Sequence, residues 1–278
     1  MGRGLKSSRF VRAVLAPSSD GIRTRFNSRP TVGAPMTWSA PQRYLAEFIG
    51  TFGLLLFGGG TAVFTLDQGD PLSRVAVVSG AFGLTIVGAV YALGDVSGGH
   101  FNPAVTLSMA MNKRMPARDV LPYLVAQVFG GLAGIAIVAG VASGSSGGWH
   151  VALQSGLGSQ CYAGNGSGCG YSVGSVFLLE LALTFVFVLV IQLVTRPESS
   201  ARNLAPAAIG LTLVVTNLAG ITIDGASINP ARSFAPALVT TLAGGPMWPI
   251  DQAWLFVVAP ILGGLLAAAV EMILRPRM

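Results

Sequence analysis

The chain has 278 residues, of which 52% are hydrophobic and only 10% are charged. An ordinary soluble domain carries about a quarter charged residues, so this composition excludes that class. The 37 glycines suit membrane helices, which approach one another closely through small residues. The composition therefore predicts a membrane protein.

The N-terminal stretch, residues 1–42, holds much of the net charge of +6. It is basic, polar and without an apolar run, which predicts a disordered cytoplasmic extension ahead of a membrane domain at 43–278. No aromatic–basic interleaving or nucleic-acid-binding motif accompanies the charges, so we expect no nucleic-acid partner. An Arg- and Ser-rich, acid-poor start also fits an organellar transit peptide, and Met36 offers an alternative start. We favour the plain extension.

Six apolar segments after Arg43 reach or approach the ~20 residues that a helix needs to cross a bilayer. We expect these spans near residues 43–65, 73–94, 119–142, 174–195, 203–221 and 252–274. Two further apolar stretches, 105–110 and 233–240, are too short to cross. Each comes after an Asn-Pro-Ala tripeptide, formed by Asn102, Pro103 and Ala104 in one case and by Asn229, Pro230 and Ala231 in the other. We interpret them as re-entrant half-helices.

The distribution of Lys and Arg predicts the orientation, because cytoplasmic loops are enriched in both. With a cytoplasmic N-terminus, 15 of the 17 Lys and Arg residues lie on the cytoplasmic side, leaving Arg74 and Arg232. We therefore expect a multi-pass protein of the plasma or inner membrane with both termini in the cytoplasm. The uncharged stretch 143–172 is then an outer loop. Its Cys161 and Cys169, the chain's two cysteines, form either a disulfide or two free thiols.

The sequence also contains an internal repeat. Glu47-Phe-Ile-Gly-Thr-Phe52 matches Glu180-Leu-Ala-Leu-Thr-Phe185, and Gly83-Leu-Thr85 matches Gly210-Leu-Thr212 at the same spacing that separates the two Asn-Pro-Ala copies. Each half, about 43–142 and about 174–274, therefore reads span, span, half-helix, span. Because three spans are an odd number, the second half inserts upside down. The predicted fold is an all-α membrane protein with six transmembrane helices and two re-entrant half-helices in an inverted repeat.

The chemistry of the repeated tripeptide favours a pore. Proline suits the first turn of a helix, and each Asn then caps that helix with its side-chain NH₂ free to donate. Two half-helices that meet by their N-termini point two positive dipole ends, about half a charge each, at the centre. The extended backbone before them offers carbonyls to a passing molecule, from Gly98, Gly99, His100, Gly225 and Ser227. We expect small neutral solutes to pass and protons and cations to be excluded.

Ser97-Gly-Gly-His-Phe-Asn-Pro-Ala-Val105, with Asn229-Pro-Ala-Arg-Ser233 and the paired Glu47 and Glu180 signatures, resembles the aquaporin (major intrinsic protein) family. The dipole barrier above is the established account of such pores. The resemblance covers about residues 43–274 and implies an aquaporin-like channel domain, a lipid-embedded homotetramer with one pore per subunit, and no cofactor. It also implies that Glu47 and Glu180 brace the re-entrant loops.

The resemblance further implies an outer selectivity filter at Phe82, Asn217, Ala226 and Arg232. Water-selective members usually place His at the position of Asn217 and Cys or Thr at that of Ala226, so a wider constriction is expected here. Glycerol-conducting members typically carry Trp at the position of Phe82 and Asp at that of Ser233. The chain is thus closer to the water branch. We expect a passive water channel that admits other small neutral solutes, with a glycerol facilitator as the alternative.

Other function classes have weaker support. The two histidines, His100 and His150, join no Cys/His/Asp cluster with metal-ligand spacing, so we expect neither an enzyme nor a metal site. A secondary transporter is a distant alternative, since such proteins also use inverted repeats and broken helices. It would need coupling residues at mid-membrane beyond Glu47, Glu180 and Arg232. A non-conducting junction protein would form tetramers without permeability.

Overall fold

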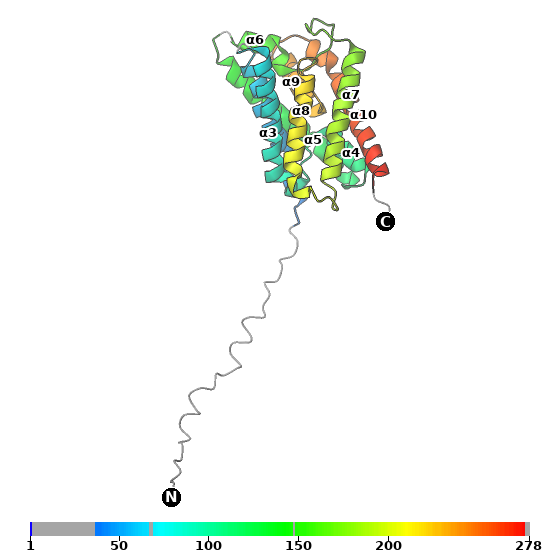
Figure 1. Cartoon of the computed structure of the whole chain (residues 1–278). Coiled ribbons are helices and arrows are strands. Elements are labelled where there is room, and N and C mark those ends of the chain that lie inside the picture. The colour runs from blue at the N-terminus through cyan, green and yellow to red at the C-terminus, as the bar shows by residue number, and fades with distance from the viewer. Residues whose placement is uncertain (2–36, 67–68, 147, 276–278) are drawn as a thin grey trace. The chain divides into compact units, whose positions relative to one another are not determined.

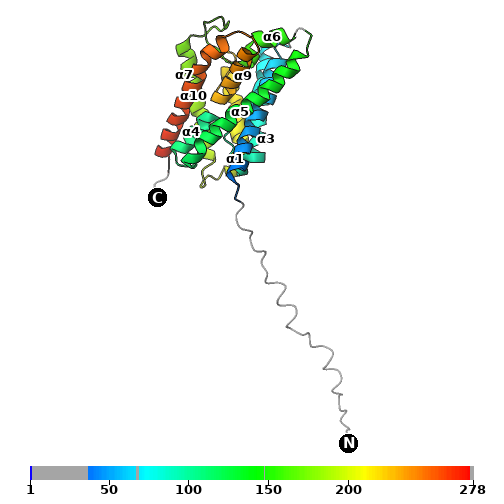
Figure 2. The same cartoon turned by 180° about the vertical axis from the view of Figure 1, so that it is seen from behind.

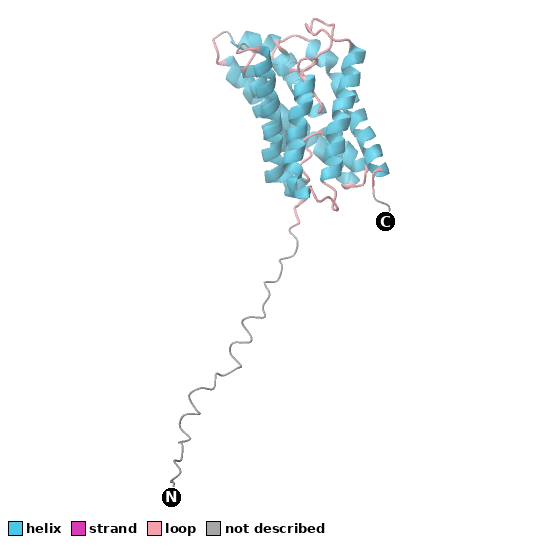
Figure 3. Ribbon diagram, in the orientation of Figure 1, coloured by secondary structure: helices cyan, strands magenta, loops and turns pink. Residues whose placement is uncertain are grey.

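The computed structural model describes residues 1, 37–66, 69–146 and 148–275. Most of the expected extension, including Met36, lies outside the described residues. The compact unit begins at Trp38. Within its described part the chain consists of helices joined by loops (Figure 3).

Six helical rods in the described residues are long and apolar enough to cross a membrane. The first is α1 (Ala40–Gly53), which continues through a π-helical stretch (Leu54–Gly59) into α2 (Gly60–Phe64). The others are α3 (Pro71–Ser97), α5 (Ala117–Ser143), α7 (Val173–Val194), α8 (Ala205–Gly220) with a preceding 3₁₀ turn (Arg202–Leu204), and α10 (Trp248–Ile273). The six predicted spans are confirmed, and each predicted boundary lies within four residues of the observed one.

Two shorter helices, α4 (Pro103–Met111) and α9 (Pro230–Leu242), are the predicted half-helices. They lie toward opposite ends of the bundle (Figures 1 and 2). We call the end where α1 begins and α10 finishes the α4 end, and the opposite one the α9 end. One short helix at the α9 end, α6 (Gly148–Gln154), was not expected in the polar stretch 143–172. It buries Ala152 and Leu153, so packing rather than sequence periodicity defines it.

Glycine contacts repeat the same packing in both halves. A Cβ atom on Gly130 of α5 would collide with the Phe48 carbonyl of α1, and one on Gly263 of α10 would collide with the Leu181 carbonyl of α7. Gly130 and Gly263 are as far apart in the sequence as Glu47 and Glu180. The residues that supply the two carbonyls, Phe48 and Leu181, have the same separation. Only glycine permits helix backbones to approach this closely. The equivalence of these contacts confirms the inverted repeat.

The helices α3 and α8 cross at another equivalent pair of glycines, Gly83 and Gly210. A Cβ on either residue would lie 2.6 Å from the carbonyl oxygen of the other. These two residues have the spacing of the Asn-Pro-Ala copies, so the approximate two-fold axis relates α3 to α8 at this crossing. The outward surfaces obey the same symmetry: Leu84 and its counterpart Leu211 are 69% and 60% exposed. Such apolar outer faces suit contact with lipid.

Candidate functional site

The two Asn-Pro-Ala copies meet by the N-termini of α4 and α9. Asn102 caps α4 by accepting a hydrogen bond from the Ala104 N–H at 2.8 Å, and Asn229 caps α9 by accepting one from Ala231 at 3.0 Å. Both asparagines are almost fully buried, and each proline occupies the first helical position. A missing proline N–H is harmless there, because the first amides of a helix have no partner within it.

Each asparagine NH₂ group donates one of its hydrogens within the protein, a contact that the expectation from sequence did not include. Asn102 donates to the Ile228 carbonyl and Asn229 to the Phe101 carbonyl, both at 2.9 Å. We call these two reciprocal bonds the asparagine clasp. The bonds have a simple cause, since buried carbonyls of non-helical backbone need donors. Because each NH₂ carries two hydrogens, one per asparagine remains for a solute.

Glu47, on α1, binds the re-entrant loop before α4. This fully buried carboxylate accepts hydrogen bonds from the N–H groups of His100 and Phe101 at 3.0 and 2.7 Å. It also accepts one from the Ser97 hydroxyl at 2.6 Å and one from the Gln127 amide at 2.7 Å. Phe101 has a left-handed backbone (φ 49°), a conformation that costs about 1–3 kcal/mol unless its surroundings enforce it. The carboxylate supplies that enforcement.

Glu180 of α7 makes the equivalent contacts in the second half. It accepts hydrogen bonds from the N–H groups of Ser227 at 2.6 Å and Ile228 at 2.8 Å. Ile228 has φ 60° and Ala226 has φ 50°, and such angles are rare for residues other than glycine. The loop before α9 is therefore strained at two positions. The amides of Ser227 and Ile228 are both directed at the Glu180 carboxylate.

All four predicted filter residues line one central cavity. Phe82 comes from α3, Asn217 from α8, Ala226 from the loop and Arg232 from the first turn of α9. The Arg232 guanidinium donates to the Gly158 carbonyl at 2.9 Å and lies 5.0 Å from the centre of the Phe82 ring. Asn217 donates its amide to the Leu213 carbonyl of its own helix at 2.8 Å. At these four positions the central cavity thus combines one fixed cation, an aromatic wall and two small side chains.

Three cavities follow one another through the bundle. The central cavity has a volume of about 20 Å³, between one of about 260 Å³ toward the α4 end and one of about 340 Å³ toward the α9 end. His100 lines both the first and the central cavity, and Arg232 lines both the central and the last. One water needs roughly 10–15 Å³ of such volume. The narrow centre therefore has room for about one or two water molecules.

The residues predicted to offer carbonyl acceptors are distributed along this series of cavities. Gly99, His100 and Ser227 line the centre, whereas Gly98 lines the cavity toward the α4 end and Gly225 the one toward the α9 end. Sequence reasoning missed the apolar part of the central wall, which consists of Leu54, Ile86, Phe187, Ile191, Ile209 and Leu213. These residues read as ordinary membrane-helix residues, and only the packing shows which of them face inward.

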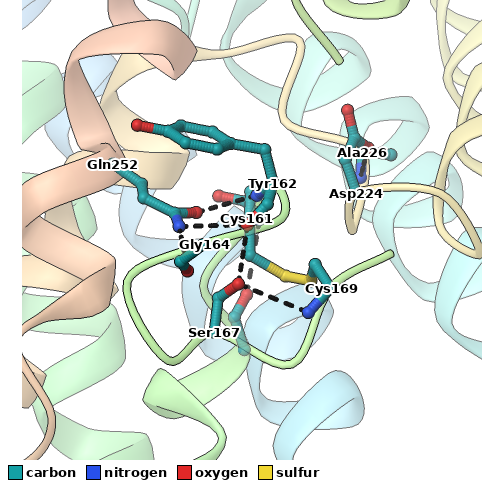
Figure 4. Close-up of a disulfide and its surroundings, with 10 residues drawn as sticks. Cys161, Tyr162, Gly164, Ser167, Cys169, Asp224, Ala226 and Gln252 are labelled. Atoms are coloured by element: carbon teal, nitrogen blue, oxygen red, sulfur yellow. Dashed lines mark hydrogen bonds between the residues drawn. A yellow bond between two sulfur atoms is a disulfide. The ribbon is translucent and has the colours of Figure 1, made fainter. Parts of the chain in front are cut away.

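At the α9 end, Cys161 and Cys169 are joined by a disulfide (Figure 4). The ring that they close is fixed to α10, because the Gln252 side chain accepts a hydrogen bond from Tyr162 N–H at 2.7 Å and donates to the Tyr162 and Gly164 carbonyls. It is also fixed to the loop before α9, where the Asp224 carbonyl accepts a bond from Cys161 N–H at 3.0 Å. The sequence had left both cysteine states open.

Comparison with known proteins places this geometry in a family. The sequence model of the major intrinsic protein family matches residues 35–271. The chain belongs to that family. It is 42% identical over 236 residues to "Aquaporin Z" of Rhodopseudomonas palustris, covering 84% of this chain and 93% of the relative. A second "Aquaporin Z", from Bradyrhizobium diazoefficiens, is 40% identical over 231 residues, or 82% and 91% of the two chains.

A solved structure adds evidence on the fold. The aquaglyceroporin from Plasmodium falciparum matches with a TM-score of 0.70 and 21% identity, covering 83% of this chain and 95% of that one. At this identity the likeness concerns the fold alone. The family resemblance found in the sequence, and its lean toward the water branch, are confirmed by the relatives. Within the described residues, no group of three or more His, Cys, Asp and Glu side chains is placed to hold a metal ion.

Proposed function

We propose that this member of the major intrinsic protein family is a passive channel that conducts water in single file. The observation that carries the proposal is the asparagine clasp at the narrowest cavity, which leaves one amide hydrogen on each of Asn102 and Asn229 for a solute. Its relatives named "Aquaporin Z" support water as the main solute. Proteins of this family are channels rather than enzymes, and the chain is not an enzyme.

The same arrangement supports exclusion of protons. A water at the centre accepts hydrogen bonds from the two asparagines, so its own hydrogens point away toward the carbonyls on either side. Those carbonyls come from His100 on one side and Ser227 on the other, and both residues line the central cavity. A proton needs a continuous chain of waters that donate in one direction, and the central water interrupts that chain.

Cations meet an electrostatic barrier as well as a loss of hydration. The N-termini of α4 and α9 both face the centre, each equivalent to about half a positive charge. The buried Arg232 guanidinium adds a full charge at the α9 side. A barrier of ~3 kcal/mol reduces flux more than a hundredfold, because about 1.4 kcal/mol corresponds to a factor of ten. Neutral solutes do not experience this barrier.

The filter also supports passage of small neutral solutes other than water. Asn217 is smaller than a histidine, and its amide is engaged with its own helix instead of extending across the passage. Ala226 presents only a methyl group. A glycerol facilitator is the second candidate, and the widened filter is the observation in its favour. Phe82 and Ser233 argue against it, since they occupy positions where glycerol-conducting members typically carry Trp and Asp.

The placement in the cell and the assembly are part of this proposal. The Lys and Arg distribution supports cytoplasmic termini in the plasma or inner membrane, with the disulfide ring outside. The equivalent exposed apolar faces at Leu84 and Leu211 support contact with lipid or with other subunits in a homotetramer. The basic extension would then lie in the cytoplasm.

The test is a permeability series on protein reconstituted into liposomes. Stopped-flow shrinkage under an osmotic gradient should be several times faster than in empty liposomes, and equal rates would refute the water proposal. Glycerol uptake measured on the same vesicles separates the two candidates. Replacing Asn217→His together with Ala226→Thr should narrow the filter and raise the ratio of water to glycerol permeability. An unchanged ratio in folded protein would refute the account of the filter.

A further inference from the structure

Asp224, in the loop before α9, is a buried acid that the proposed conduction mechanism does not use. It is 2% exposed, and its Oδ1 accepts a hydrogen bond from the Ala226 N–H at 2.8 Å (Figure 4). This bond fixes a filter residue in its left-handed conformation. The other oxygen, Oδ2, is also buried and receives no hydrogen bond from the described N–H and O–H groups. A buried acceptor of this kind requires an explanation.

The first half of the chain contains the counterpart of Asp224. With the spacing of the two Asn-Pro-Ala copies, Asp224 corresponds to Ser97 and Ala226 to Gly99. The Ser97 hydroxyl accepts a hydrogen bond from the Gly99 N–H at 3.2 Å and donates one to the Glu47 carboxylate at 2.6 Å. A hydroxyl can make both bonds because it is donor and acceptor at once. It thereby links the loop backbone to the bracing carboxylate.

Asp224 occupies the same position in the second half. Its Oδ1 accepts the bond from Ala226, as Ser97 does from Gly99, and its carboxyl lies against the bracing Glu180, as the Ser97 hydroxyl lies against Glu47. An ionised carboxylate can only accept hydrogen bonds. A bond between two carboxyl groups therefore requires a proton on one of them.

The charges around Asp224 favour retention of that proton. The titratable and charged groups that face it are Glu180 from α7 and Arg232 from α9. The neighbouring ring contributes backbone contacts, and its cysteines are joined in the disulfide. Two carboxylates in one buried site do not both ionise readily. Burial, and next the charge of Glu180, raise the pKa of the Asp224 carboxyl above its ordinary value.

We propose that Asp224 is a protonated positioning residue, whose carboxylic acid donates to Glu180 and accepts from the Ala226 N–H. This role of Asp224 rests on the proposed function, because it takes Ala226 to be a wall of the filter. The loop is then fixed at three successive amides, Ala226 by Asp224 and the next two by Glu180. Loss of the proton leaves two negative charges in contact and loosens this wall. The channel is therefore sensitive to alkaline pH.

Three variants separate the protonated from the ionised state. Asp224→Asn keeps a donor and an acceptor in the same shape, Asp224→Ser copies the arrangement of the first half, and Asp224→Ala removes both bonds. The matched control is Asp251→Asn, which neutralises an exposed acid near the same end of the bundle. Infrared spectra should contain the carbonyl band of a protonated carboxylic acid in the wild type and in the control, but not in Asp224→Asn. Spectra of Asp224→Asn identical to the wild type in this region would overturn the proposal.

Stability provides a second readout with a defined sign. The folded state keeps a proton that the unfolded state releases above about pH 4, so wild-type stability falls as pH rises from there to the folded pKa. The difference between the thermal midpoint of Asp224→Asn and that of the wild type should therefore increase in favour of the variant as pH rises from about 5 to about 10. This range brackets a raised carboxyl pKa. A constant difference across that range would also overturn the proposal.

Water permeability connects the proton to the filter. Wild-type permeability should change as pH rises through the folded pKa, whereas that of Asp224→Asn and Asp224→Ser should stay level, and that of Asp224→Ala should be low throughout. A pH profile of Asp224→Asn that parallels the wild type would contradict the proposed role. The infrared band and the thermal midpoints do not depend on conduction. They can therefore succeed even if liposomes containing the wild type prove impermeable, which would refute the water proposal alone.

Discussion

The width of the proposed filter can be tested by substituting a residue that packs against the outer side of one of its walls, without changing any residue that lines it. The Phe82 ring, one wall of the filter, lies directly against Gly58 in the π-helical stretch of the first rod. A methyl group at this position would occupy space that the ring now fills. We therefore predict that Gly58→Ala pushes Phe82 toward the passage and narrows it.

The size of the effect follows from the geometry. A Cβ atom on Gly58 would lie 2.7 Å from Phe82 Cγ, with two further ring atoms closer still, whereas ordinary contacts begin at 3.4 Å. The ring must therefore retreat by more than about 0.7 Å, and its free side faces the central cavity and Arg232. Overpacking of this kind costs about 1–3 kcal/mol. If that energy appears in the barrier to water, permeability per channel falls between about fivefold and about 150-fold.

The assay is stopped-flow water permeability, normalised to the amount of reconstituted protein and accompanied by a thermal unfolding curve. Gly88→Ala is the matched control, because Gly88 lies on α3 like Phe82 and a Cβ there meets nothing within 4 Å. The double variant Gly58→Ala with Phe82→Leu should recover permeability, since a smaller side chain relieves the collision. Folded Gly58→Ala with the permeability of wild type would show that the ring does not limit flow.

Two other predictions concern the parts that hold the filter and loops in place. Glu47→Gln should lower the thermal midpoint by the equivalent of about 1–3 kcal/mol. Each carboxylate oxygen accepts one of the His100 and Phe101 amides, so in the variant the glutamine NH₂ group must face one of these N–H groups. An unchanged midpoint would contradict the bracing role. Reduction of the disulfide, which closes a sequence separation of 8, should cost about 2.6 kcal/mol from loop entropy. The midpoint should fall with reductant in the wild type but not in a Cys161→Ser, Cys169→Ser variant, and equal responses would refute a stabilising ring.

The sequence was sufficient to predict the arrangement of spans because that arrangement depends on length, hydropathy and repetition. Each apolar segment is long enough to cross, and Glu47 and Glu180 identify the two halves because each is followed by the same Thr-Phe pair. The odd number of spans per half then requires the inversion. The positions of Asn102 and Asn229 as helix caps followed from the adjacent prolines. None of these inferences required a contact between distant residues.

What the sequence could not supply depends on backbone conformation and on contacts across the two-fold axis. The left-handed conformations of Phe101 and Ile228 turn their carbonyls toward the opposite half, and nothing in these residue types indicates that turn. The asparagine clasp follows from it, so it was missed. Asp224 was missed for a different reason. Its counterpart is Ser97, and a comparison that looks for identical residues does not align a hydroxyl with a carboxyl.

The proton on Asp224 also bears on how the filter can exclude cations. The filter needs the field of Arg232, yet a buried guanidinium needs a negative charge nearby. Glu180 supplies one such charge and offsets part of that of Arg232, while α9 adds its positive N-terminus. An ionised Asp224 would add a second negative charge beside the same arginine and cancel the field that repels cations. The neutral acid keeps the hydrogen bond that positions Ala226 and leaves the field intact. Cation leak through the channel should therefore rise with pH in the wild type and remain low in Asp224→Asn. A leak that responds equally to pH in both proteins would refute this link between the positioning of Ala226 and the exclusion of cations.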